Sequence, residues 1–407
     1  MEGNWAPPRV RHNFRIDLIG AISAGVYITI LVTFMPVVVR RMGGSAADVA
    51  LIIAAPFIGH LLSPIGTYLY SGIAPVRVVA ATATLGRIIF LGGVLVATGP
   101  NMLAITTVIF FIISTSNIGA YTTLMQGIYP DSERARAMAN VRIGASIAGI
   151  AAAALAGAFI DVLPASVVFL AAALFSLPGA IAFFGIRFER PKAIATRRSV
   201  ALVARDIWAD RRYRRLLLAA TVFGVGNLMN VAMYPLLLVD HFQASNSFIG
   251  AMTVVTSATS IIAYLVWGRV IDRGSSIRLT LVNCVVTLLI PIGFIAATDT
   301  WQLIPVAVIT GIVNAGGELT FFTNIVQLAP RERIVEYAAA QSFLMGIRGT
   351  LAPFVASALL GLVDARAVLL TGVLFMMTGA WIMSGAARLA TQSRVQAVPA
   401  PVQTPAD

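Results

Sequence analysis

Long runs of apolar residues recur along almost the whole chain, separated by short polar stretches. The run from Leu18 to Val39 exceeds the ~20 apolar residues that a helix needs to cross a hydrocarbon core about 30 Å thick. Because such runs are continuously apolar and do not alternate, they predict membrane-spanning helices and not the strands of a membrane barrel. We expect twelve spans, at about 16–39, 46–70, 76–98, 102–127, 136–158, 164–186, 215–239, 247–267, 277–297, 301–327, 337–361 and 365–387.

The composition agrees with this pattern. The 407 residues are 58% hydrophobic and 11% charged, and the mean hydropathy is +0.87, whereas soluble domains have roughly 25% charged residues. The chain is therefore expected to be an all-α integral membrane protein. The first run is too long for the core of a signal peptide, so we expect it to be retained. The single cysteine, Cys284, excludes an intrachain disulfide.

A net charge of +12 raises the question of nucleic-acid binding, and the placement of the basic residues answers it. With a cytoplasmic N-terminus, most of them fall in the tails and the even-numbered loops, and the outer loops carry only Arg40, Arg41 and Arg366. This asymmetry is typical of membrane proteins with positive cytoplasmic loops. We expect a multi-pass protein of the cytoplasmic (inner) membrane with both termini cytoplasmic, in contact with lipids and without a nucleic-acid partner.

The chain divides into two sets of helices. We expect a cytoplasmic tail at 1–15, a six-helix bundle at 16–187, a basic cytoplasmic linker at 188–214, a second six-helix bundle at 215–388 and a disordered cytoplasmic tail at 389–407. The linker has apolar residues at helical spacing, which suits a short helix on the membrane face as well as an ordinary solvated linker. These residues are Val200, Val203 and Ile207, beside Trp208.

The two sets also repeat. Asn117 and Gln126 have the same spacing as Glu318 and Gln327, so the fourth and tenth spans correspond. Further matching pairs are Gly25 and Gly224, Pro36 and Pro235, and Gly66 and Gly268. Repeated halves of this kind place a binding site at their interface, near the middle of the bilayer.

One loop carries a specific resemblance. In GRVIDRGSSIR, between the eighth and ninth spans, the sequence resembles the cytoplasmic loop of the major facilitator superfamily, and the likeness extends over about residues 15 to 390. The matching residues are Gly268, Asp272, Arg273, Gly274 and Arg278. The resemblance implies two pseudo-symmetric six-helix bundles, with this loop as a gate. The first-half version, GTYLYSGIAPVR, has Tyr70 and Ser71 in place of Asp-Arg, and the arginine that many proton-coupled members carry in the fourth span is absent.

Ionisable residues inside the spans are the remaining candidates for function. Inserting a charged side chain at a helix centre costs about 2.5–3.5 kcal/mol on insertion scales, so each such residue needs a partner or a function. Glu318 lies one turn after Asn314, and it suits proton coupling or substrate contact, or a static ion pair with an intramembrane arginine. Arg348 suits contact with Glu318 or with an anionic substrate.

The other intramembrane charges are expected to have structural roles. Arg142 suits contact with Glu318 or with an anionic substrate, but its closeness to the basic residues Arg134 and Arg136 favours extension to the cytoplasmic interface. We expect Arg87 to bond a neighbouring helix. Asp17 is expected to stabilise the start of its helix, because a carboxylate interacts favourably with the positive end of the helix dipole.

Polar residues in the fourth and seventh spans are expected to line a cavity. Ser114, Asn117 and Tyr121 share one predicted helix face, and so do Asn227, Asn230 and Tyr234. Further cavity candidates are Tyr27, His60, Asn314 and Arg348. For His60 a hydrogen bond between helices is the alternative.

No enzyme signature is present: there is no Walker A sequence, HExxH, CxxC or nucleophile elbow. We therefore expect no catalysis, cofactor or metal, and a monomer that moves a small solute by alternating access as a secondary transporter, with proton coupling as one option. Three intramembrane arginines against one deep glutamate favour an anionic or zwitterionic solute. The alternatives are a drug/proton exporter, or a lipid-handling or sensory protein without coupled transport.

Overall fold

The computed structural model describes residues 8–70, 72–188, 200–273, 275–330 and 333–396, and all regular structure in these ranges is helical. The helices of the first half are α1 (Pro8–Arg41), α2 (Ala46–Leu69), α3 (Pro75–Val96), α4 (Pro100–Thr115), α5 (Ile118–Ile128), α6 (Asp131–Ile160), α7 (Ala165–Ala182) and the turn η1 (Phe183–Gly185). Then follow α8 (Val200–Ala209), α9 (Arg211–Leu236), η2 (Leu237–His241), α10 (Asn246–Arg273), α11 (Ser276–Thr287), α12 (Leu289–Ala296), η3 (Thr300–Gln302), α13 (Leu303–Leu328), α14 (Ile334–Leu360) and α15 (Ala365–Gln396).

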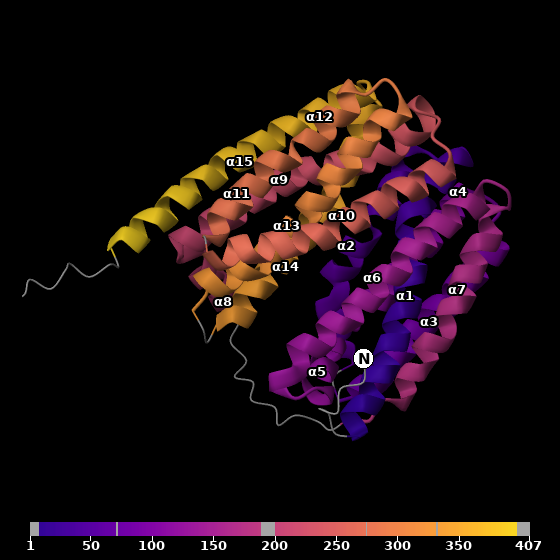
Figure 1. The fold of residues 1–407 in the computed structure, drawn as a ribbon, viewed down its shortest axis with the longest axis horizontal. Helices are drawn as coiled ribbons and strands as arrows, with labels where there is room; N and C mark the ends of the chain where they lie inside the picture. The colour runs from indigo at the N-terminus through magenta and orange to yellow at the C-terminus, as the bar shows by residue number, and fades with distance from the viewer. Residues whose placement is uncertain (1–7, 71, 189–199, 274, 331–332, 397–407) are drawn as a thin grey trace, which may run out of the picture.

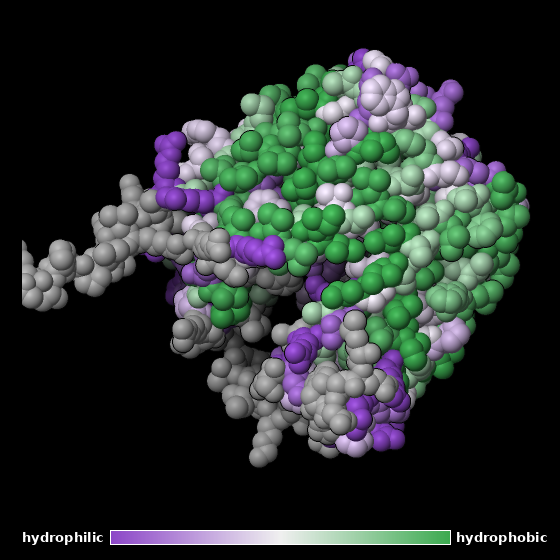
Figure 2. All heavy atoms as spheres, viewed as in Figure 1, coloured by the Kyte–Doolittle hydropathy of each residue, from purple (hydrophilic) through white to green (hydrophobic). Residues whose placement is uncertain are grey.

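The helices form two bundles, α1–α7 and α9–α15 (Figure 1). We call the end where α1 begins and α15 finishes the terminus end, and the opposite end, where α1 finishes, the remote end. Figure 2 shows a broad apolar belt across the flank of the molecule, with hydrophilic residues toward its ends. Large apolar side chains such as Leu265, Leu374 and Trp381 are exposed on the surface. Such a surface is stable only where lipid is the solvent.

Eleven helices in the described ranges are long and apolar enough to span a membrane, and α4 with α5 makes a twelfth if the bent pair is one span. This agrees with the twelve predicted spans. The pair bends by 41°, and hydroxyl groups at the bend compete for backbone carbonyls: Thr115 donates to Phe111 and Ser116 to Ile113, both at 2.7 Å. Such bonds are a known cause of helix bending.

Among the described residues, the hydrophobic core that the two bundles share lies at the remote end. There a single cluster joins residues of both halves, including Phe34 of α1 and Met233 of α9. Toward the terminus end each bundle has a separate core, one around Leu124 and the other around Tyr213. The bundles are therefore packed together at one end and diverge at the other, as Figure 1 shows.

Two predicted boundaries differ from the structure. Helix α1 begins at Pro8, inside the predicted tail, because Asn13 bonds the backbone of Arg187 at 2.8 and 2.9 Å and so fixes the early turns to the end of the first bundle. Helix α15 continues to Gln396, inside the predicted disordered tail, and 1–7 and 397–407 lie outside the described residues. The linker contains α8, which is the short helix that the sequence offered as one alternative, and its Ile207 is buried in the core of the second bundle.

Candidate functional site

A cavity of about 700 Å³ lies between the bundles, mostly within the second one. This volume is in the range of small-molecule sites, ~300–1,000 Å³. Helices α9 to α14 supply most of the wall, and α1 and α2 close the side toward the first bundle. Its polar lining residues are Thr33, Asn227, Tyr234, Thr253, Thr256, Asn283, Thr287, Thr310, Asn314, Glu318 and Arg348.

An ion pair connects the two bundles beside this cavity. Nη1 of Arg142, on α6, lies 2.7 Å from Oε1 of Glu318, on α13. The hydroxyl of Tyr264, on α10, donates to the other carboxylate oxygen. The two charged side chains are 64% and 42% exposed, so the pair is accessible from outside the protein. Of the two alternatives for Arg142, the structure shows contact with Glu318 and not extension to the cytoplasmic interface.

Arg348, on α14, has a different environment. Its guanidinium lies against Gly224 of α9, where a Cβ would collide with it, and Nη1 donates to the carbonyl of Ala220. Its Nε is buried without a hydrogen-bond partner. Among the described residues no carboxylate contacts Arg348. Glu318, which we considered as its partner, is instead paired with Arg142.

Polar contacts between the bundles close the remote end. Arg40 makes a bidentate ion pair with Asp240, at 2.7 to 3.0 Å, and Arg41 donates to the carbonyl of Ala244. These contacts join the last turn of α1 to η2 and to the segment that follows it. The charges that sequence analysis placed in an outer loop therefore serve as ties between the two halves.

Asp161, at the end of α6, caps the start of α10 across the same interface. It accepts from the backbone and side chain of Asn246 at 2.9 and 2.8 Å, and from those of Ser247 at 2.8 and 2.6 Å. Burial would raise the pKa of Asp161, but these hydrogen bonds outweigh it and hold the pKa below the usual 3.8. The carboxylate is thus ionised in the closed arrangement.

Close backbone contact accompanies the polar ties. A Cβ at Gly157 of α6 would collide with the carbonyl of Asn246, and one at Gly250 of α10 with the carbonyl of Ala153. Small residues of this kind allow membrane helices to approach closely.

Five of the candidate residues line the cavity, and six others lie elsewhere, among them Ser114, whose hydroxyl lies beside Gly86 of α3. The lining residues are Asn227, Tyr234, Asn314, Glu318 and Arg348. Tyr27 is buried in the first bundle, with its ring edge-on to Phe90 and Phe110. Asn230 does not share the face of Asn227, because its amide donates to the sulfur of Met376 on α15 at 3.4 Å.

The remaining candidates are in the first bundle. Asn117 stands at the bend between α4 and α5 and donates to Thr82 of α3 at 2.6 Å. Because the span bends at this point, Asn117 and Tyr121 do not share one straight helix face as predicted. Tyr121 packs against the core around Leu124 at the terminus end. His60 is half-buried in α2 and does not line the cavity.

The gating loop stays a prediction. Gly268 faces open space on α10, and Arg278 is exposed on α11. Gly274 and the side chains of Asp272 and Arg273 lie outside the described part of the chain.

The two other intramembrane charges have clear partners. Arg87 donates through Nε to Ser176 of α7 at 2.8 Å, which confirms the expected bond to a neighbouring helix. The helix-start role of Asp17 is wrong, because α1 begins at Pro8, and Asp17 instead accepts from the hydroxyl of Tyr129 at 2.8 Å.

Sequence reasoning missed Asn283 of α11, which also lines the cavity. An amide inside the apolar run 277–297 was the signal that could have found it.

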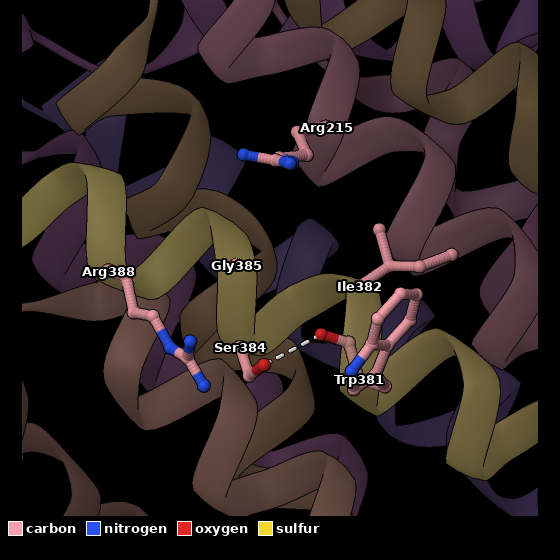
Figure 3. Close-up of a pocket in the computed structure, with 6 residues that line it drawn as sticks. All are labelled: Arg215, Trp381, Ile382, Ser384, Gly385 and Arg388. Atoms are coloured by element: carbon pink, nitrogen blue, oxygen red, sulfur yellow. Dashed lines mark hydrogen bonds between the residues drawn. The ribbon is translucent and has the colours of Figure 1, made fainter.

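A second, smaller pocket of about 280 Å³ lies on α9 and α15 (Figure 3). Figure 3 shows Arg215 and Arg388 on either side of Gly385, with Trp381 beyond them. Ser384 only bonds the carbonyl of Trp381, at 2.7 Å. This pocket shares no lining residue with the central cavity.

Two helix bundles around a polar cavity are typical of a class of membrane transport proteins. Comparison with known proteins indicates the same class. The family model of the Major Facilitator Superfamily matches residues 18–347 and 216–404. The chain belongs to this superfamily, which is a family of membrane transporters and not of enzymes. The predicted family and the predicted all-α, multi-pass membrane fold are confirmed.

Solved structures show the same fold. A mutant of the nucleoside transporter NupG superimposes with a TM-score of 0.72 at 13% identity, covering 92% of this chain and 99% of that one. A bacterial homologue of the human lysosomal transporter Spinster, in an inward-facing and unoccupied conformation, gives 0.72 at 13% identity, covering 94% and 98%. No curated protein matches the sequence.

Proposed function

We propose that this protein is a secondary active transporter that moves a small solute across the cytoplasmic membrane by alternating access. One observation carries the proposal: the polar cavity is closed at the remote end by ties between the bundles, while the bundles separate toward the terminus end. Figure 2 shows hydrophilic residues in the hollow where they diverge. With both termini cytoplasmic, as the distribution of basic residues favours, the cavity faces the cytoplasm in this arrangement.

The ion pair between Arg142 and Glu318 supports proton coupling. It lies beside the cavity, connects the two bundles and is open to water, so a proton can reach the carboxylate. Protonation removes the negative charge and therefore the ion pair. The separation of α6 from α13 then costs less, so proton binding at Glu318 favours one arrangement of the bundles over the other.

The test is proton movement in proteoliposomes that contain a trapped pH-sensitive dye. A panel of organic anions, sugars and cationic drugs is added in turn under an imposed pH gradient. We expect at least one compound to change the dye signal with the unmodified protein, and Glu318→Gln to abolish this change.

Glu336→Gln is the matched control, since Glu336 pairs with Arg333 three residues away and neither residue lines the cavity. It should keep the unmodified response. Solute movement that ignores both the pH gradient and Glu318→Gln contradicts proton coupling. The absence of any compound-dependent movement favours the lipid-handling or sensory alternative.

A further inference from the structure

The charged residues of the cavity wall do not balance. The lining contains Arg348 and Glu318, and Glu318 is already engaged by Arg142 and Tyr264. Among the described lining residues Arg348 is thus a cation without a counter-ion. An unpaired charge away from bulk water is unfavourable, so this site favours an anion that enters the cavity.

The position of Arg348 is set by the surrounding helices. Gly224 leaves space for the guanidinium, and the bond from Nη1 to the carbonyl of Ala220 fixes its end on α9. Nε is left buried and without a partner. The titratable side chain beside it is the thiol of Cys284, which supplies no negative charge while it is protonated.

Two more hydrogen-bond donors line the same cavity. The first is the amide of Asn283. Its Nδ2 lies beside Gly317, which lines the cavity, and its Oδ1 lies beside Gly316, which does not. The hydroxyl of Tyr234 is buried without a partner. The wall therefore combines one positive charge with donors from three helices, α9, α11 and α14.

An aromatic surface adjoins these donors. The ring of Tyr234 stacks on that of Phe294, with centroids 4.3 Å apart and planes at 13°, and both residues line the cavity. Most of the remaining wall is aliphatic, from residues such as Met252, Ile290 and Val306. An apolar body gains free energy by leaving water for such a surface.

We propose that the cavity binds small organic monocarboxylates, with the carboxylate on Arg348 and Asn283 and an aromatic or aliphatic body against Tyr234 and Phe294. The proposal rests on the transport function proposed above and names its substrate class. A carboxylate fits a planar guanidinium and carries one charge, which balances one cation. A phosphate monoester, with about −1.5 to −2 charges at neutral pH, would leave an excess of negative charge in the cavity.

The first test uses the unmodified protein and matched probes. Binding of 3-phenylpropionate, its neutral amide 3-phenylpropanamide and the cation 3-phenylpropylammonium is measured by calorimetry in detergent. We expect the carboxylate to bind about tenfold or more tightly than the amide, because hydrogen bonds between charged partners are roughly twice as strong as neutral ones. Equal binding of carboxylate and amide, or stronger binding of the cation, overturns the proposal.

The second test uses two arginine variants. Arg348→Gln should lose the preference for the carboxylate, whereas Arg215→Gln, in the separate pocket of Figure 3, should keep it. A preference retained in Arg348→Gln refutes the site. If this variant does not fold because the bond to Ala220 is lost, Asn283→Ala replaces it, with weaker carboxylate binding expected and unchanged binding as the contrary result.

Binding and transport are measured separately, so the two proposals fail differently. Tight carboxylate binding without gradient-driven movement removes the transport function and keeps the anion site. Gradient-driven movement of neutral or cationic compounds, with no carboxylate binding, removes the anion site and keeps the transporter.

Discussion

The capping of α10 by Asp161 predicts how readily the remote end opens. Asp161→Ala removes four hydrogen bonds that cross between the bundles. These bonds exist only while the remote end is closed, so their loss destabilises the closed arrangement relative to the open one. The carboxylate is near the surface, where loss of a helix cap costs about 0.5–2 kcal/mol. At ~1–2 kcal/mol, the ratio of open to closed molecules rises roughly 5–30-fold.

Distances between spin labels at the remote end measure this ratio. The buried Cys284 is first replaced by Ala, and labels are attached to cysteines placed at Met42 and Leu362, which are exposed in the two halves. Asp161→Ala should add a population with a longer distance.

Asp48→Ala is the control for a lost cap. Asp48 accepts from the backbone and side chain of Ser45 at 2.8 and 2.7 Å, entirely within the first bundle. It should leave the label distances unchanged. Identical distances for Asp161→Ala and the unmodified chain, or an equal shift in the control, would refute the reasoning.

Three further predictions concern pH and packing. The pKa of Asp161 is depressed in the closed arrangement, so its stabilisation is complete above the ordinary value of 3.8 and is lost as the pH falls through the depressed pKa. In Glu318→Gln, which lacks the proposed proton site, the label distances should therefore not change between about pH 8 and 5. Gly25→Ala places a Cβ against the carbonyl of Ala145 and should lower the unfolding temperature, at a cost of about 1–3 kcal/mol, whereas Gly92→Ala, with no atom within 4 Å, should not. Arg87→Leu leaves Ser176 without its donor partner in the membrane and should lower thermal stability while ligand binding to the remaining folded protein is unchanged.

The sequence was sufficient for the spans and their division into halves, because lipid requires continuous apolar helices whatever their partners. Boundaries were less accurate where tertiary bonds extend a helix, as at Asn13, which holds the polar start of α1 against Arg187. The bend at Ser116 was also missed, since it depends on hydroxyl bonds that an apolar pattern does not reveal.

The candidate site was predicted in part for a similar reason. Glu318 and Arg348 stood out because ionisable residues are rare inside spans, and both line the cavity. Their partners depend on how the bundles face each other, which one sequence cannot give. Extension to the cytoplasmic interface was therefore favoured for Arg142, although the structure shows the alternative, an ion pair with Glu318.

The separate cores at the terminus end have a consequence for synthesis of the chain. The core around Leu124 is complete once the first bundle has been made, and it includes Val10 and Phe183 from the two ends of that bundle. The second bundle likewise encloses Tyr213 and Met383 from its first and last helices. Each half thus contains a core that joins its own first and last helices. A chain divided at 189–199 and expressed as two separate polypeptides should therefore reassemble through the core that the bundles share at the remote end.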